Sequence, residues 1–466
     1  MRNITDAFIE KVQRMNLEEL DESVVREAKK AVLDTIACMI VGTNSDIGKA
    51  TMEVFSEFGG KEEAMIVGRG KKYPAAISAY INAETCVGPD LSDNYQPDSI
   101  IISHPGEAVV PPVLAVAERE NATLGDFLVA VIAGYELAGR YARAIEPRRP
   151  EVYSFSTHYT IAGALGCAKL LRFDDRRMKT TLGVAGALGS LPVTSPMWGF
   201  RERPASWHRD MPGHSSFSAV LASQYAQTDF QACRRLLDPE IAFYKLAGSE
   251  NYDPNLLVEN WGGGWVIENI TYKKIPSCYF QQTGVEMVRL LVEEHSLGND
   301  DIAAIDIYQP KNFAANFIEY PPQTSVDTAS SLRYLISAYL LNRKIGPDWY
   351  EKYREYLVRR DFQEIADKVT IHKDEDLQRL FDTETIVKGR ARLQTRDGKV
   401  FEKELRLEQI KGNFQNNPMA YEEIVDKFMD LSAPVVGKAN ARKFVDVLES
   451  GAYDGRMRAV VEVLGC

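Results

Sequence analysis

Four of the six histidines of this 466-residue chain lie between residues 104 and 214, each with Gly, Pro, Ser or Trp within two positions. They are His104, His158, His208 and His214. Histidine can take up and release a proton under physiological conditions, because the pKa of its imidazole lies near neutral pH. An acidic loop, residues 89–94 (Pro-Asp-Leu-Ser-Asp-Asn), precedes the first of the four. This combination predicts a proton-transfer site. The alternative is that these histidines are hydrogen-bonded core residues or surface residues without a chemical role.

Helices are the elements that must position these groups. Residues 28–41 are apolar on more than one side and end at Gly42, which predicts a helix inside a bundle. Residues 73–88 are Ala-rich and of the same type. The loop from residue 88 to 105, rich in Asp, Asn, Pro and Ser, is too long for a simple connection. Long ordered loops are often functional, so this loop is a candidate for the site.

Further helices are expected before residue 230, and the character of the chain changes near residue 262. The expected helices are 107–120, 124–144, 158–172, 175–192 and 213–227, with an irregular segment at 193–212. After them, alternation and β-branching predict a strand over Val266–Tyr272. A helix (283–295), a strand (301–308) and a hairpin (385–407) turning at Arg396-Asp397-Gly398 follow, and helices resume near 419.

The expected fold is therefore mostly α with an α+β second domain. Residues 1–264 and 413–466 would form a large all-helical domain, and residues 265–412 would form a smaller α+β lid.

Composition excludes several classes of protein. A net charge of −11 argues against a nucleic-acid partner, since the phosphate backbone requires a basic surface. The N-terminus lacks the basic stretch followed by an apolar run that would predict a signal peptide. The sequence also lacks a run of 18 apolar residues, which would predict a membrane span. The six cysteines contain no C-x-x-C pair and fit a reducing cytoplasm. The glycine stretches at 68–70 and 262–264 lack the spacing of a nucleotide loop. We therefore expect a cytoplasmic protein without membrane contact, metal or cofactor.

Six short stretches, in the same order along the chain, resemble motifs of the MmgE/PrpD family, which includes 2-methylcitrate dehydratase, cis-aconitate decarboxylase and iminodisuccinate epimerase. They are residues 33–38 (LDTIAC), 82–94, 104–112, 133–137 (AGYEL), 212–213 (PG) and 273–278 (KKIPSC). The resemblance extends over nearly the whole chain. It implies a homodimer with a large helical domain, a smaller α+β lid and a metal-free site between them. It also implies a small di- or tricarboxylate as substrate.

The chain departs from the family pattern at several polar positions. Ser92 replaces the middle aspartate of the acidic loop and Asn94 replaces its threonine. His208 stands where the family has a lysine, and Met211 where it has a histidine three residues later. Cys278 takes the place of a histidine that some members carry in the lid.

The resemblance implies proton removal from the carbon next to a carboxylate. That step needs a placed base and cations that stabilise the enolate-like charge. Asp90 paired with His104 would suit the base role. Alternatively, Asp90 only caps the following turn and His104 only closes a loop. His158 would donate a proton to a departing hydroxyl or bind a carboxylate; alternatively, it only begins a helix beside Thr157. We expect Asp90, His104, His158 and His208 to be the catalytic residues.

Substrate binding is expected of five further residues. Lys273 would hold a carboxylate from the lid, and Arg209 would do so with two parallel hydrogen bonds. Asn94 and Gln282 would hydrogen-bond a hydroxyl, amide or amine, which suggests a substrate less anionic than citrate. Cys278 would be a packing residue, a polar wall or a redox-sensitive thiol, and no adjacent base marks it as a nucleophile.

Four functions are consistent with this pattern. The first is a metal-independent lyase of the hydratase or dehydratase type, similar to 2-methylcitrate dehydratase. The alternatives are an epimerase or isomerase of the iminodisuccinate type, which would need two bases on opposite faces, and a decarboxylase of the cis-aconitate type, which would need a protonating group. The last is a non-catalytic binding paralogue.

Overall fold

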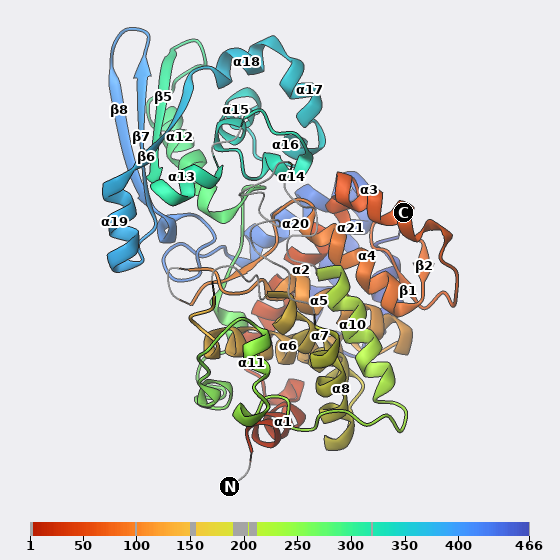
Figure 1. The fold of residues 1–466 in the computed structure, drawn as a ribbon. Coiled ribbons are helices and arrows are strands. Elements are labelled where there is room, and N and C mark those ends of the chain that lie inside the picture. Colours follow the sequence, from red (N-terminus) through yellow and green to blue (C-terminus); the bar gives the residue numbers. More distant parts are fainter. Residues whose placement is uncertain are drawn as a thin grey trace.

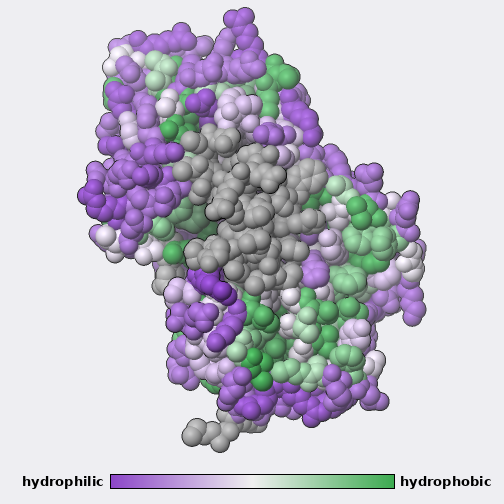
Figure 2. All heavy atoms as spheres, viewed as in Figure 1, coloured by the Kyte–Doolittle hydropathy of each residue, from purple (hydrophilic) through white to green (hydrophobic). Residues whose placement is uncertain are grey.

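The computed structural model describes residues 3–97, 100–149, 155–189, 204, 212–317 and 320–465. A large group of helices occupies the lower part of Figure 1, and a smaller part with a four-stranded sheet lies above it. On the face that Figure 2 shows, hydrophilic side chains cover much of the upper part. Apolar side chains gather in the lower region where Figure 1 places α8 and α10.

The lower part is built from helices at both ends of the chain. Its longer helices are α1 (Ile4–Arg14), α2 (Glu22–Gly42), α3 (Asp46–Val54), α4 (Ala75–Val87), α5 (Pro105–Glu120), α6 (Leu124–Ala144), α7 (Phe155–Leu170), α8 (Asp175–Leu188), α10 (Pro212–Tyr225), α20 (Tyr421–Val436) and α21 (Lys438–Glu449). The short helices α11 (Phe243–Leu246) and α22 (Met457–Glu462) complete it. One cluster of buried apolar side chains extends from Phe8 to Leu464. The C-terminal helices therefore share a core with the N-terminal ones, and α20 packs against α2.

Helices α5, α6 and α7 lie at the centre of this part and pack against one another. Two glycines permit their close approach. A Cβ atom at Gly134 would lie 2.4 Å from Cγ1 of Val109, and one at Gly163 would lie 2.7 Å from the main-chain oxygen of Ala108. Interiors are packed too densely to absorb such overlaps, so glycine is required at both positions. The close packing fixes the N-terminal ends of α5 and α7, where His104 and His158 lie.

The upper part has its own core. Its strands are β5 (Ile302–Pro310), β6 (Val369–Asp374), β7 (Lys388–Thr395) and β8 (Val400–Arg406). Its helices are α12 (Gln282–Glu294), α13 (Lys311–Phe317), α14 (Ser325–Thr328), α15 (Leu332–Asn342), α16 (Asp348–Glu351), α17 (Tyr353–Val358), α18 (Arg360–Ala366) and α19 (Glu375–Glu384). The strand order is β6-β5-β7-β8, with β5 and β6 parallel and the other pairs antiparallel. The predicted hairpin is confirmed, and Gly398 adopts a φ of +86° at its turn.

Two short sheets complete the fold. Strands β1 (Ala64–Met65) and β2 (Lys72–Tyr73) pair beside α4. Strand β3 (Asn94–Tyr95), inside the predicted functional loop, pairs with β4 (Ile270–Thr271), which leads from the lower to the upper part. This pairing brings the loop next to Lys273.

The strand predicted over Val266–Tyr272 is wrong for its first half, which forms a 3-10 helix, Val266–Asn269. The main-chain N–H of Val266 donates to the carboxylate of Glu136 at 2.6 Å, and that of Trp265 donates to Glu268 at 3.0 Å. These donors therefore bind side chains instead of a neighbouring strand, and only Ile270–Thr271 remains extended.

In the part of the chain that the structure describes, no helix is both long and apolar enough to cross a membrane.

Candidate active site

His104 stands directly before α5, as the residue that begins the helix, and is buried. Its Nδ1 lies 2.7 Å from the main-chain oxygen of Asp93. Because a carbonyl oxygen only accepts hydrogen bonds, Nδ1 carries the proton, and the lone pair of the neutral imidazole is on Nε2. The main-chain N–H of His104 donates to Oη of Tyr159 at 3.1 Å, and the ring of Phe155 meets the imidazole edge-on. The backbone thus sets both the position and the tautomer of this histidine.

Asp93 is the residue that holds His104. Its Oδ1 accepts from the main-chain N–H of Gly106 at 2.9 Å, in the first turn of α5, and its Oδ2 accepts from Oη of Tyr135 at 2.8 Å. Burial, followed by the nearby charge of Asp34, raises its pKa to about 7, although both hydrogen bonds favour the carboxylate. The residue whose backbone holds the imidazole therefore carries a carboxyl group with a pKa near neutral pH.

Asp90 forms a buried ion pair with Lys273. The Nζ atom of Lys273 lies 2.6 Å from Oδ1 of Asp90 and 3.4 Å from its main-chain oxygen. Asp90 adopts a φ of 51°, a left-handed conformation that is uncommon for aspartate. Among the described contacts, the Asp90 carboxylate pairs with Lys273 and His104 binds the backbone of Asp93. The expected pairing of Asp90 with His104 is not among these contacts.

His158 lies in the first turn of α7 and is fully buried. Its Nε2 lies 3.1 Å from Oγ of Ser103, the residue before His104. Ser103 in turn forms a bridge with Tyr95 of β3. The structure therefore brings His158 to the same short segment as His104, so that two imidazoles and the Asp90–Lys273 pair are all attached to the loop between residues 90 and 104.

The predicted neutral polar residues are all buried. Among the described residues, neither amide atom of Asn94 has a hydrogen-bond partner. Gln282 donates from Nε2 to the main-chain oxygen of Ile275 at 3.0 Å, and its Oε1 accepts no hydrogen bond there. The main-chain N–H of Cys278 donates to the oxygen of Ala329 at 2.9 Å. A buried amide without a partner is costly, so Asn94 and Gln282 have capacity to bind a polar ligand group.

Three positions of the sequence analysis, His208, Arg209 and Met211, lie outside the described residues. His214 is described: it lies in α10, and its Nε2 is 3.1 Å from the main-chain oxygen of Leu188. This histidine packs near the start of the helix.

Four further residues of this region were not singled out from the sequence: Asp34, Asp93, Tyr135 and Lys427. The Nζ atom of Lys427 lies 2.6 Å from Oδ1 of Asp34 and 3.0 Å from the main-chain oxygen of Leu91. Burial raises the pKa of Asp34, while Lys427 works to lower it. One signal was available, because Asp34 is the one charged residue within the mostly apolar segment 31–41.

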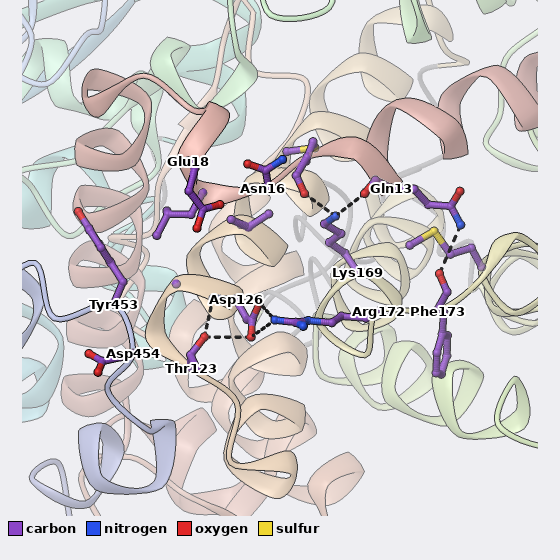
Figure 3. A pocket seen from close by; sticks show the side chains of 15 residues that line it. Gln13, Asn16, Glu18, Thr123, Asp126, Lys169, Arg172, Phe173, Tyr453 and Asp454 are labelled. Atoms are coloured by element: carbon purple, nitrogen blue, oxygen red, sulfur yellow. Dashed lines mark hydrogen bonds and ion pairs between the residues drawn. The ribbon is translucent and has the colours of Figure 1, made fainter.

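A cavity of about 690 Å³ lies away from this loop, between α1, α6 and α7 (Figure 3). Lys169 points across it and donates to the main-chain oxygens of Gln13 and Met15 at 3.0 and 2.6 Å. Arg172 binds both carboxylate oxygens of Asp126 at 2.9 and 3.1 Å. These contacts tie α1 and α6 to the end of α7, and none of the histidines that the structure describes lines the cavity. The cavity therefore lies where these helices pack together, and it is not a candidate for the proton-transfer site.

Within the described ranges, no three or more His, Cys, Asp or Glu side chains are grouped so that they could hold a metal ion.

Comparison with known proteins covers nearly the whole chain. Residues 6–254 match the MmgE/PrpD N-terminal domain, and residues 275–450 match the MmgE/PrpD C-terminal domain. A cis-aconitate decarboxylase of Aspergillus terreus is 21% identical over 485 residues, covering 99% of this chain and 96% of the relative. A cis-aconitate decarboxylase of Homo sapiens is 22% identical, covering 97% and 90%. A cis-aconitate decarboxylase-like protein oryM of Aspergillus oryzae is 23% identical over 39% of each chain.

Proposed function

Since the chain belongs to the MmgE/PrpD family, with both of its parts matched, we propose that it is a carboxy-lyase for a small unsaturated di- or tricarboxylate of the cis-aconitate type. From the sequence alone, hydratase or dehydratase chemistry is the first expectation and decarboxylation is one of the alternatives. The full-length relatives are named cis-aconitate decarboxylases, which favours the latter. At 20–22% identity, these relatives support a class of reaction and do not identify one particular substrate.

The observation that carries this proposal is the 2.7 Å contact between Nδ1 of His104 and the main-chain oxygen of Asp93. It leaves Nε2 as the atom that takes up a proton and delivers it. Decarboxylation needs such a group, because the carbanion that remains when CO₂ leaves must be protonated on carbon.

The proposed step is balanced within substrate and protein. The bond between carbon and one carboxylate breaks, and CO₂ leaves. The electron pair passes into the adjoining double bond and towards a second carboxylate, giving an enolate-like anion. A proton on Nε2 of His104 is then transferred to carbon, and the imidazole takes up a new proton from water. His158 is the second group that can move a proton, through its contact with Ser103.

Cations are needed to bind the carboxylates and to stabilise the enolate-like charge. Lys273, held by Asp90, is one of them, and His208 and Arg209 are proposed as the others. Asn94, Gln282 and Cys278 supply the neutral part of the binding surface. The homodimer and the cytoplasmic location also remain proposals.

Proton NMR of the purified protein in D₂O tests the reaction. The panel consists of cis-aconitate, citrate, 2-methylcitrate and amino dicarboxylates, run with and without a chelator. We expect one substrate to lose a carboxyl group and to gain one deuterium on carbon. The change should be absent in His104→Ala and present in His372→Gln, a matched control in which a half-exposed histidine of β6 is replaced.

The other outcomes identify the other functions. A hydroxyl group lost or gained without CO₂ release indicates a dehydratase, and deuterium entering with inversion of a centre indicates an epimerase. Ligand-induced shifts without any turnover indicate a binding paralogue. Each of these results contradicts the proposed carboxy-lyase.

A further inference from the structure

We propose that Asp93 and Lys427 are positioning residues for His104. Asp93 anchors the loop whose backbone fixes the imidazole, and Lys427, from the C-terminal helix α20, fastens that loop to α2. This inference rests on the proton-transfer role proposed for His104.

The contacts of Asp93 explain how one residue can hold His104. Its main-chain oxygen accepts from Nδ1 of the imidazole at 2.7 Å. Its carboxylate accepts from Gly106 on α5 at 2.9 Å and from Tyr135 on α6 at 2.8 Å. The side chain therefore joins two helices, and the backbone of the same residue holds the histidine between them. Any rotation of the Asp93 backbone would move the acceptor away from Nδ1.

Lys427 fastens the loop through a second contact. Its Nζ donates to the main-chain oxygen of Leu91, two residues before Asp93, at 3.0 Å. The same atom lies 2.6 Å from Oδ1 of the fully buried Asp34. The ammonium group is thus held in place by a carboxylate of α2 and holds the loop through a carbonyl group. Lys427 touches neither imidazole in the described contacts, so any effect on the reaction must pass through the loop.

The packing around Asp93 leaves little room for the loop to move. A Cβ atom at Gly106 would lie 2.5 Å from Oγ1 of Thr35 on α2 and 2.8 Å from Oδ1 of Asp93. The N-terminal end of α5, the side chain of Asp93 and α2 are therefore in direct contact. The anchor is a packed arrangement as well as a hydrogen-bonded one.

The test measures the tautomer of His104 in the absence of substrate. The protein is labelled with ¹⁵N-histidine, and the signals of His104 are identified by their loss in His104→Ala. The Nδ1–H tautomer should dominate in the wild type. Both tautomers should appear in Asp93→Ala and in Lys427→Met, because the acceptor for Nδ1 is no longer fixed. Turnover should fall about 10- to 100-fold with little change in KM, as expected when a proton-transfer group is misplaced.

Three further variants separate positioning from general damage. Lys411→Met removes a lysine paired with Glu423 of the same α20 helix and should leave the tautomer unchanged. Asp93→Asn keeps an acceptor for Gly106 and gains a donor for Tyr135, so it should retain the tautomer even if Asp93→Ala does not fold. The double variant Asp34→Asn/Lys427→Met removes both buried charges together. It should still show both tautomers, since Leu91 has lost its donor.

A wild-type spectrum in both Asp93→Ala and Lys427→Met would overturn the inference. An equal change in Lys411→Met, or loss of the tautomer in Asp93→Asn, would also overturn it. Because the spectrum is recorded without substrate, failure of the proposed carboxy-lyase activity would leave this result intact and would be recognised separately.

Discussion

Replacing Asp93 by asparagine should remove a pH-dependent loss of stability from the protein. The carboxyl group is fully buried, and its pKa is raised from 3.8 to about 7, chiefly by burial and then by Asp34. Between these two pH values the unfolded chain has released the proton of Asp93, whereas the folded chain still holds it. The stability that this proton contributes is complete below about pH 4 and is lost as the pH rises through about 7.

The magnitude follows from the size of the shift. A pKa raised from 3.8 to about 7 corresponds to about 4 kcal/mol of unfolding free energy, at about 1.36 kcal/mol per unit. The asparagine variant carries no such charge at any pH. The difference in unfolding free energy, variant minus wild type, should therefore rise by up to about 4 kcal/mol between about pH 4 and pH 8.

Urea unfolding followed by circular dichroism measures this difference at several pH values. Asp376→Asn serves as the control, because this aspartate is 85% exposed in its side chain and pairs only with Arg379 in the described contacts. Its difference from the wild type should not vary with pH. Parallel pH profiles for Asp93→Asn and the wild type would refute the reasoning, since they would mean that Asp93 is ionised in the folded protein at low pH.

Two further predictions concern the same region. Lys273→Met should lower the unfolding free energy by about 3–5 kcal/mol, because the buried carboxylate of Asp90 loses its lysine. In urea unfolding, the double variant Asp90→Asn/Lys273→Met should recover much of this loss. A loss that is undiminished in the double variant would contradict the ion-pair explanation. Gly106→Ala should lower the unfolding free energy by about 1–3 kcal/mol in thermal unfolding, because the added methyl group overpacks against Thr35 and Asp93. Gly59→Ala is the control and should be neutral, because its Cβ atom would meet nothing within 4 Å. Equal effects of the two variants would contradict the packing explanation.

The fold was largely predictable from the sequence because apolar patterns and turn residues mark its elements directly. The helices around residues 28–41 and 124–144 and the hairpin at Gly398 were confirmed, as were the mostly α fold class and the MmgE/PrpD family. The strand over Val266–Tyr272 failed for a specific reason. The carboxylate of Glu136, 130 residues away, binds the N–H group of Val266 that a strand would have used.

The sequence singled out candidate site residues, which stay a prediction, but it did not reveal their contacts. The histidines and Asp90 were identified from their types and from the family pattern, but the partner of Asp90 is 183 residues away, at Lys273. Nothing local distinguishes Asp93 from Asp90 in the acidic loop. Lys427 lies in a helix with many exposed charges, and only the three-dimensional structure brings it to Asp34, 393 residues earlier. Contacts of this kind leave no periodic signal in a sequence.

The contact between Lys427 and the backbone of Leu91 also has a consequence during synthesis on the ribosome. The two residues are 336 positions apart, and translation proceeds at about 5–20 residues per second. The acidic loop is therefore made tens of seconds before the lysine that fastens it, and the whole upper part is translated in between. Until then, the face of α2 that α20 covers in the finished protein has no partner from the C-terminal helices. Nascent chains arrested before residue 427 should therefore expose this face to chaperones, and the site should form as one of the last steps of folding.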